Sequence, residues 1–147
     1  MKRLQSQSDR LPSSLRILLL VVAGILFVLL GVAAMIEPDE RGYGTHQKLG
    51  LPPCTFQFVT GVRCPSCGMT TSWAYLVRGQ LIKSLKSNTG GTLVGVIAML
   101  LAPWALLSGL RGRWFWKSFN DWAALIVTLA VILVTLVDWS VRFFVRS

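Results

Sequence analysis

Residues 17–36 read ILLLVVAGILFVLLGVAAMI, a run of 20 residues that contains no charge. A helix needs about 20 mostly apolar residues to cross the hydrocarbon core of a bilayer, so this run predicts a membrane span. A signal peptide also begins with basic residues, but its apolar region of about 7–15 residues is shorter. We therefore interpret residues 17–36 as an uncleaved first span.

Two further apolar stretches follow, at residues 92–110 and 122–139. Pro103 interrupts the first of them, and packed neighbouring helices tolerate such a proline in a membrane. Gly91 and Gly95 lie four residues apart at its start, a spacing that lets another helix approach closely. The sequence therefore predicts an all-α integral membrane protein with three transmembrane helices.

The composition supports this class of protein. The 147 residues are few enough for a single domain, and 53% of them are hydrophobic while 14% are charged. A soluble domain has about a quarter charged residues, so this chain lacks the polar surface that a globule in water needs. The formal net charge of +9 favours anionic lipid headgroups as the partner. We expect contact with the lipid bilayer, leave other membrane proteins open as partners, and expect no nucleic acid.

The charges around the first span predict its orientation. Basic residues precede the span and acidic residues follow it: Lys2, Arg3, Arg10 and Arg16 before, Glu37, Asp39 and Glu40 after. Basic residues beside a span are retained in the cytoplasm. We therefore expect a cytoplasmic N-terminus with the connection at residues 111–117 on the same side. Residues 54–86 and the C-terminus are then expected outside the cytoplasm.

The segment between the first two spans contains VRCPSCGMTTSWAYL at residues 62–76. Met69 and Trp73 recur at helical spacing, so a helix is expected after the cysteines. Gly79 predicts its end, because glycine readily adopts the left-handed conformation that follows a last helical turn. A second short helix before Asn88 completes a short amphipathic helical hairpin between spans one and two.

Side chains near the cysteines and in the third span carry further expectations. The hydroxyls of Thr70, Thr71 and Ser72 are expected to bond to the first turn of their own helix. Phe58 is expected to pack on the face of that helix, together with the neighbouring Phe56 and Val59. Asp138 and Arg142 stand four residues apart and are expected to pair at the membrane interface.

The cysteine motif resembles that of a known family. Cys54, the pair Thr60-Gly61 and the run CPSCGMTT from Cys64 are similar to the signature of the family called domain of unknown function two-seven-five-two. Its members are small bacterial membrane proteins with a CPxCGxTR motif. The resemblance implies a multi-pass protein of the bacterial inner membrane, and it supplies no reaction.

The resemblance covers about residues 54–88 and singles out several positions beside the cysteines. These motif residues are Pro65, Gly68, Thr70, Thr71, Gly79 and Asn88. The chain departs from the family pattern at Thr71, where the family usually has arginine, and at Thr89, where it tends to have proline.

Three uses of the cysteines remain open. Cys54, Cys64 and Cys67 with His46 would make a Cys₃His set of ligands for zinc. A thiol–disulfide relay would use Cys67 as a thiolate at the head of a helix, where free N–H groups favour the charge, and Cys54 as a resolving thiol. A structural disulfide between Cys54 and either Cys64 or Cys67 is the leading interpretation outside the cytoplasm. All three uses require these thiols to converge in one small cluster.

The sequence contains no Ser/His/Asp set, no paired carboxylates and no nucleotide-binding fingerprint. No catalytic residue, no small-molecule substrate and no cofactor other than zinc are therefore assigned. We expect a non-enzymatic accessory or scaffold protein with a structural thiol cluster. The alternatives are a membrane thiol–disulfide oxidoreductase and a zinc-binding membrane protein.

Overall fold

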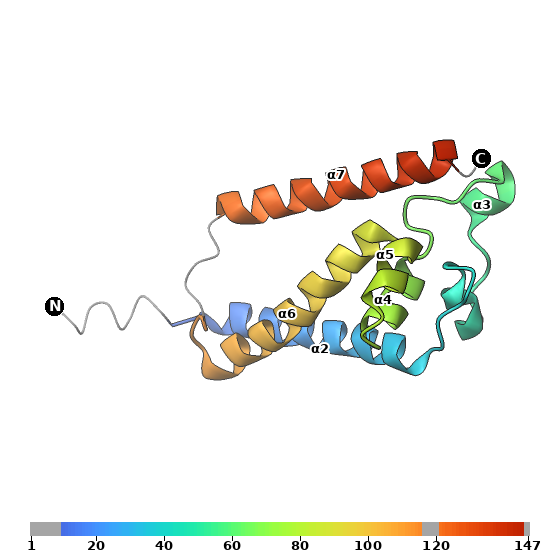
Figure 1. Ribbon diagram of the computed structural model, residues 1–147. Helices are drawn as coiled ribbons and strands as arrows, with labels where there is room; N and C mark the ends of the chain where they lie inside the picture. The colour runs from blue at the N-terminus through green and yellow to red at the C-terminus, as the bar shows by residue number, and fades with distance from the viewer. Residues whose placement is uncertain (1–9, 116–120, 146–147) are drawn as a thin grey trace.

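The computed structural model describes residues 10–115 and 121–145. In chain order the elements of this part are α2 (Ser13–Met35), the 3-10 helix η1 (Thr45–Leu49), α3 (Thr55–Thr60), α4 (Met69–Leu76), α5 (Leu81–Ser87), α6 (Thr89–Arg111) and α7 (Asp121–Val145). Figure 1 shows α2 beside α6, with α4 and α5 near the start of α6 and α7 along the other side. Because the described residues form helices and no strand, the expected all-α class is confirmed.

In the described part of the chain, three helices are long and apolar enough to cross a membrane. They supply the apolar segments 13–35, 89–111 and 122–144, which correspond to the three predicted spans. Pro103 lies inside α6, as the sequence predicted. The chain is therefore a multi-pass membrane protein.

Small residues allow α2 and α6 to pack closely. Ala23 of α2 and Ala105 of α6 are both buried, at 0% and 1% exposure. A Cβ atom at Gly109 would lie 2.9 Å from the side chain of Leu20. Close packing of this kind is how helices associate in lipid, where burial of apolar surface gives no advantage over contact with lipid tails.

The start of α2 and the end of α6 lie at the same end of the bundle. The N–H of Leu11 donates a hydrogen bond of 2.9 Å to the carbonyl of Gly112. Arg10 and Arg113 form an isolated antiparallel bridge beside it. The first and second spans therefore run in opposite directions.

The predicted helical hairpin is confirmed. α4 ends at Leu76, Gly79 adopts a φ of +73°, and α5 begins at Leu81 and ends at Ser87. The left-handed glycine reverses the chain between the two helices, as the sequence predicted.

Gly91 and Gly95 allow α4 to approach α6. A Cβ atom would lie 2.6 Å from Ser72 Oγ if added at Gly91, and 2.7 Å from the side chain of Leu76 if added at Gly95. Trp73 Nε1 also donates a hydrogen bond of 2.9 Å to the carbonyl of Gly91. The close approach expected from this glycine pair is confirmed, and the approaching helix is α4 rather than another span.

The second helix of the hairpin buries its hydroxyl groups and exposes its apolar side chains. Ser84 is fully buried, whereas Leu81 and Ile82 are 51% and 71% exposed. Ser84 Oγ donates to the carbonyl of Ser72 over 2.8 Å and lies 2.7 Å from Thr92 Oγ1. A polar interior under an apolar exterior is typical of helices that pack in lipid.

The third span contacts the rest of the protein through its C-terminal half. Thr135 packs directly against Gly90, where a Cβ atom would collide with the threonine side chain. Asp138 Oδ1 accepts a hydrogen bond of 3.0 Å from Thr89 Oγ1. The end of α7 therefore lies near the start of α6, at the end of the bundle that also carries α3 (Figure 1).

Two left-handed glycines provide a test of the packing around the hairpin. Gly68 and Gly79 have φ values of +92° and +73°. A Cβ atom at Gly68 would lie 2.6 Å from the carbonyl oxygen of Ser87 and 2.7 Å from that of Gly42, whereas one at Gly79 would meet nothing within 4 Å. We expect Gly79→Ala to lower the free energy of unfolding by about 1–2 kcal/mol, the cost of the left-handed conformation.

Gly68→Ala should cost about 1–3 kcal/mol more than Gly79→Ala, because the added methyl group also overpacks against two backbone carbonyls. Thermal denaturation of both purified variants in detergent measures the difference. Equal losses of stability would contradict the close packing of Gly68.

Candidate functional site

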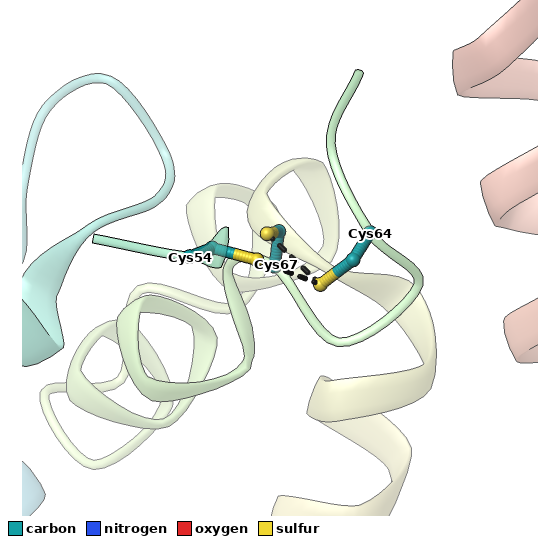
Figure 2. Close-up of side chains that lie close together, drawn as sticks. All are labelled: Cys54, Cys64 and Cys67. Carbon is teal, nitrogen blue, oxygen red and sulfur yellow. Dashed lines mark hydrogen bonds between the residues drawn. The ribbon is translucent and has the colours of Figure 1, made fainter. Parts of the chain in front are cut away.

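The three cysteines come from the two ends of the loop that contains α3 and meet at the head of α4. Cys54 directly precedes α3, Cys64 follows it in a loop, and Cys67 lies just before α4. The sulfur of Cys64 lies 3.6 Å from that of Cys54 and 3.0 Å from that of Cys67. All three sulfurs lie within 4.8 Å of one another, and all three thiols are free. The predicted thiol cluster is confirmed (Figure 2).

Two successive turns bring Cys64 and Cys67 together. The N–H of Cys67 donates to the carbonyl of Cys64 over 3.0 Å, and the N–H of Met69 donates to the carbonyl of Ser66 over 3.1 Å. Pro65 has the fixed φ that suits the second position of the first turn. Gly68 supplies the positive φ for the second turn. The residues of the CPxCG turn, 64–68, therefore determine its shape locally.

The loop between Cys54 and Cys64 contains a short helix, α3, that the sequence analysis did not predict. α3 ends at Thr60, and Gly61 directly after it has a φ of +72° and reverses the chain toward Cys64. The expectation that Phe58 and its neighbours pack on α4 is wrong, because the exposed fractions of Phe56, Phe58 and Val59 are 44%, 84% and 74%. One turn and a half of helix has too few residues to turn an apolar face inward and also return the chain to Cys64.

Asn88 holds the CPxCG turn against the start of α6. Its side chain is 1% exposed. The amide nitrogen donates to the carbonyls of Pro65 and Cys67 over 2.9 and 3.1 Å. The amide oxygen accepts a bond of 2.6 Å from the N–H of Gly91, which makes Asn88 the N-cap of α6. One carboxamide thus satisfies polar backbone groups of two separate elements.

The third span also reaches the CPxCG turn. Trp139 Nε1 donates a bond of 2.8 Å to the carbonyl of Arg63. Arg142 Nη1 donates to the carbonyl of Cys67 over 3.4 Å and to that of Ser87 over 3.5 Å. The expected ion pair is confirmed, since Arg142 Nη2 lies 2.6 Å from Asp138 Oδ2. The spacing of four residues did not predict, however, that Arg142 also contacts the CPxCG turn.

The three thiols differ in acidity. Burial raises the pKa of the Cys67 thiol to about 12, and hydrogen bonds with the Cys64 and Cys54 thiols add to this effect. The N–H of Gln57, in the first turn of α3, is the main cause that lowers the pKa of the Cys54 thiol. Burial therefore opposes the free thiolate that the relay interpretation places at Cys67. Burial outweighs the helix terminus at Cys67.

A cavity of about 200 Å³ adjoins the three thiols. His46 and Thr70 are among its lining residues. His46 does not belong to the group of mutually close ligand atoms, which contains the three sulfurs alone among the described residues. Thr71 also lines the cavity, but its hydroxyl lies 2.7 Å from that of Thr45 on η1, and both residues are fully buried. The expectation that the Thr71 hydroxyl bonds to its own helix is therefore wrong, because this hydroxyl joins α4 to η1 instead.

Residues 54–102 match the family model described as "Protein of unknown function (DUF2752)". This match confirms the resemblance to that family over residues 54–102. The matched segment begins at Cys54 and ends within α6, so it contains the thiol cluster, the hairpin and Asn88. Comparisons with curated proteins and with solved structures found no match.

Two substitutions at Asn88 separate its two structural roles. Asn88→Asp keeps an oxygen for the N–H of Gly91 but replaces the two N–H donors with an oxygen that faces the carbonyls of Pro65 and Cys67. Asn88→Ala removes both roles. Loss of a cap costs about 0.5–2 kcal/mol, and each buried group that is left unpaired costs about 1–3 kcal/mol.

We expect both Asn88 variants to lose about 3 kcal/mol or more, with Asn88→Asp at least as unstable as Asn88→Ala. Thermal denaturation in detergent and the rate of Cys67 alkylation report stability and detachment of the turn. A nearly natural stability for Asn88→Asp would show that only the cap of α6 matters.

Proposed function

We propose that this protein is a non-enzymatic accessory or scaffold protein of the bacterial inner membrane, in which the thiol cluster is a structural and partner-binding element. The observation that carries the proposal is the use of the CPxCG turn as a junction. Backbone carbonyls of the turn and of the preceding residue accept hydrogen bonds from Asn88, Trp139 and Arg142. The turn therefore links the start of α4 to α6 and to α7.

The environment of Cys67 supports a structural role over thiol exchange. An exchange enzyme needs an accessible thiolate as its nucleophile. Cys67 is 7% exposed, and burial raises the pKa of its thiol to about 12. Cys54 is the thiol with the lowered pKa, and Cys64 lies 3.6 Å from it. A relay would therefore have to begin at Cys54 and resolve at Cys64.

That order gives a direct test of the structural role. In a relay, Cys64→Ser would leave a mixed disulfide trapped on Cys54, because the resolving thiol is gone. We expect the Cys64→Ser variant to form no mixed disulfide in cells quenched with acid. The control is the double variant Cys54→Ser/Cys64→Ser, and the two should contain equal amounts of mixed disulfide. Non-reducing electrophoresis followed by mass spectrometry measures the adduct. An adduct on Cys54 alone would favour the oxidoreductase.

The packing of the spans supports the proposed topology. The start of α2 and the end of α6 are joined at one end of the bundle, and the thiol cluster lies with the end of α7 at the other. Basic residues precede the first span and acidic residues follow it, so the end with the start of α2 and the end of α6 should face the cytoplasm. The thiol cluster would then lie outside the cytoplasm.

Reporter fusions test this orientation. Fusions at Lys48 and at the C-terminal Ser147 should behave as extracytoplasmic, and a fusion at Arg113 should behave as cytoplasmic. Alkaline phosphatase, which needs an oxidising compartment, and green fluorescent protein give opposite readouts at each site. An active phosphatase at Arg113 with a fluorescent reporter at Lys48 would invert the orientation and leave the contacts within the bundle unchanged.

A further inference from the structure

We propose that Cys54, Cys64 and Cys67 are the three protein ligands of one Zn²⁺ ion. The inference rests on the structural role proposed above and names the group that the thiol cluster takes. In this state the metal, rather than a disulfide, joins the loop that contains α3 to the CPxCG turn.

The separations of the sulfurs fit a tetrahedral thiolate site. With Zn–S bonds of about 2.3 Å, two sulfurs on a tetrahedral ion lie roughly 3.8 Å apart. The Cys54 and Cys64 sulfurs are 3.6 Å apart, the Cys64 and Cys67 sulfurs are 3.0 Å apart, and all three lie within 4.8 Å of one another. Side-chain rotations that move the sulfur atoms by a few tenths of an ångström to about one ångström would suffice to bind the ion.

The number of converging thiols favours a metal over a disulfide. A disulfide uses two sulfurs and needs no third one beside it. Here Cys54 lies before α3, whereas Cys64 and Cys67 lie in the CPxCG turn. The left-handed Gly61 after α3 and the turn closed by the bond from Cys67 N–H to the Cys64 carbonyl bring the three sulfurs together. The convergence of three soft ligands is what a thiolate metal site requires.

The surroundings hold the CPxCG turn in place. Arg142 Nη1 donates to the carbonyl of Cys67 over 3.4 Å. Asn88 fixes the carbonyl of Cys67 from the other side. Partners of this kind, which orient ligands without touching the metal, contribute substantially to metal affinity.

A cavity of about 200 Å³ adjoins the thiols and leaves space for a fourth ligand. The cavity has room for a water molecule. His46 lies on its wall but outside the group of close ligand atoms. We therefore assign the fourth position to water and give His46 no bond to the metal.

Binding involves no change of oxidation state. Three S–H bonds are replaced by three Zn–S bonds, and three protons pass to the solvent. Zn²⁺ is the divalent ion that suits a tetrahedral site of thiolates, whereas Mg²⁺ and Ca²⁺ prefer oxygen ligands. Metal binding also protects the thiols from oxidation, because the sulfur lone pairs are engaged.

The test uses the full chain in detergent, reduced, freed of metal and kept under argon. On titration with Zn²⁺, native mass spectrometry should show one zinc per chain. Co²⁺ in its place should give the strong thiolate-to-cobalt absorption of a tetrahedral site. Cys54→Ser should weaken zinc binding by at least about 100-fold, since even loss of a residue that only orients a ligand costs roughly 10- to 100-fold.

Two variants of residues that line the same cavity serve as matched controls. Ser66→Ala lies within the CPxCG turn and His46→Gln on the cavity wall, and both should bind zinc as tightly as the natural sequence. Circular dichroism confirms that each variant keeps its helices. Cys54 is chosen because it is partly exposed, so that its substitution perturbs the bundle least.

The proposal is overturned if the reduced chain binds no zinc, or if Cys54→Ser binds it with unchanged affinity. A disulfide would be identified instead if the purified chain has the mass of the reduced chain minus two hydrogens and, once reduced, binds no zinc. Each of these three outcomes leaves the structural role intact, because that role fails only if a mixed disulfide is trapped on Cys54 in cells.

Discussion

The side chain of Asn88 is the constraint on which the rest of this end of the bundle depends. Its carboxamide caps α6 and at the same time satisfies the carbonyls of Pro65 and Cys67. The bonds with Cys67 and Gly91 are buried and the bond with Pro65 is partly buried, which makes an unpaired partner costly. The register between the CPxCG turn and α6 is therefore fixed, and the close fit of Gly68 against the carbonyl of Ser87 follows from it.

Buried polar groups also hold together the rest of the protein interior. This interior consists of hydroxyl groups and small residues rather than of large apolar side chains. Fully buried polar residues include Thr45, Thr71, Ser72, Ser84 and Ser108. In lipid, apolar side chains gain nothing by turning inward, whereas hydrogen bonds and close backbone approach do hold helices together. The hairpin follows this rule although it is too short to span the membrane, since α5 presents Leu81 and Ile82 outward and Ser84 inward.

The parts of the structure that depend on local sequence could be predicted, and the parts that depend on distant contacts could not. Length and hydropathy were sufficient for the three spans, and Gly79 was sufficient for the break between α4 and α5. The cysteine spacing predicted a cluster of thiols. Helical periodicity, however, shows which residues share a face and not which face points inward, so the buried serines were missed. The bond from Trp139 to Arg63 joins residues that are 76 positions apart, and no local pattern indicates it.

The loop that contains α3 explains why the thiols matter for structure. α3 packs against none of the other helices that the structure describes, and Phe58 and Val59 on it are largely exposed. Burial therefore stabilises this loop little, and its conformation depends on its two ends. Those ends are Cys54 and Cys64, whose sulfurs lie 3.6 Å apart. A link between them removes closure entropy from the unfolded chain, on the order of 2–3 kcal/mol for a loop of this length. Because the third thiol, on Cys67, belongs to the turn that Asn88 holds, a link through all three sulfurs would attach the loop to the most constrained point of the protein.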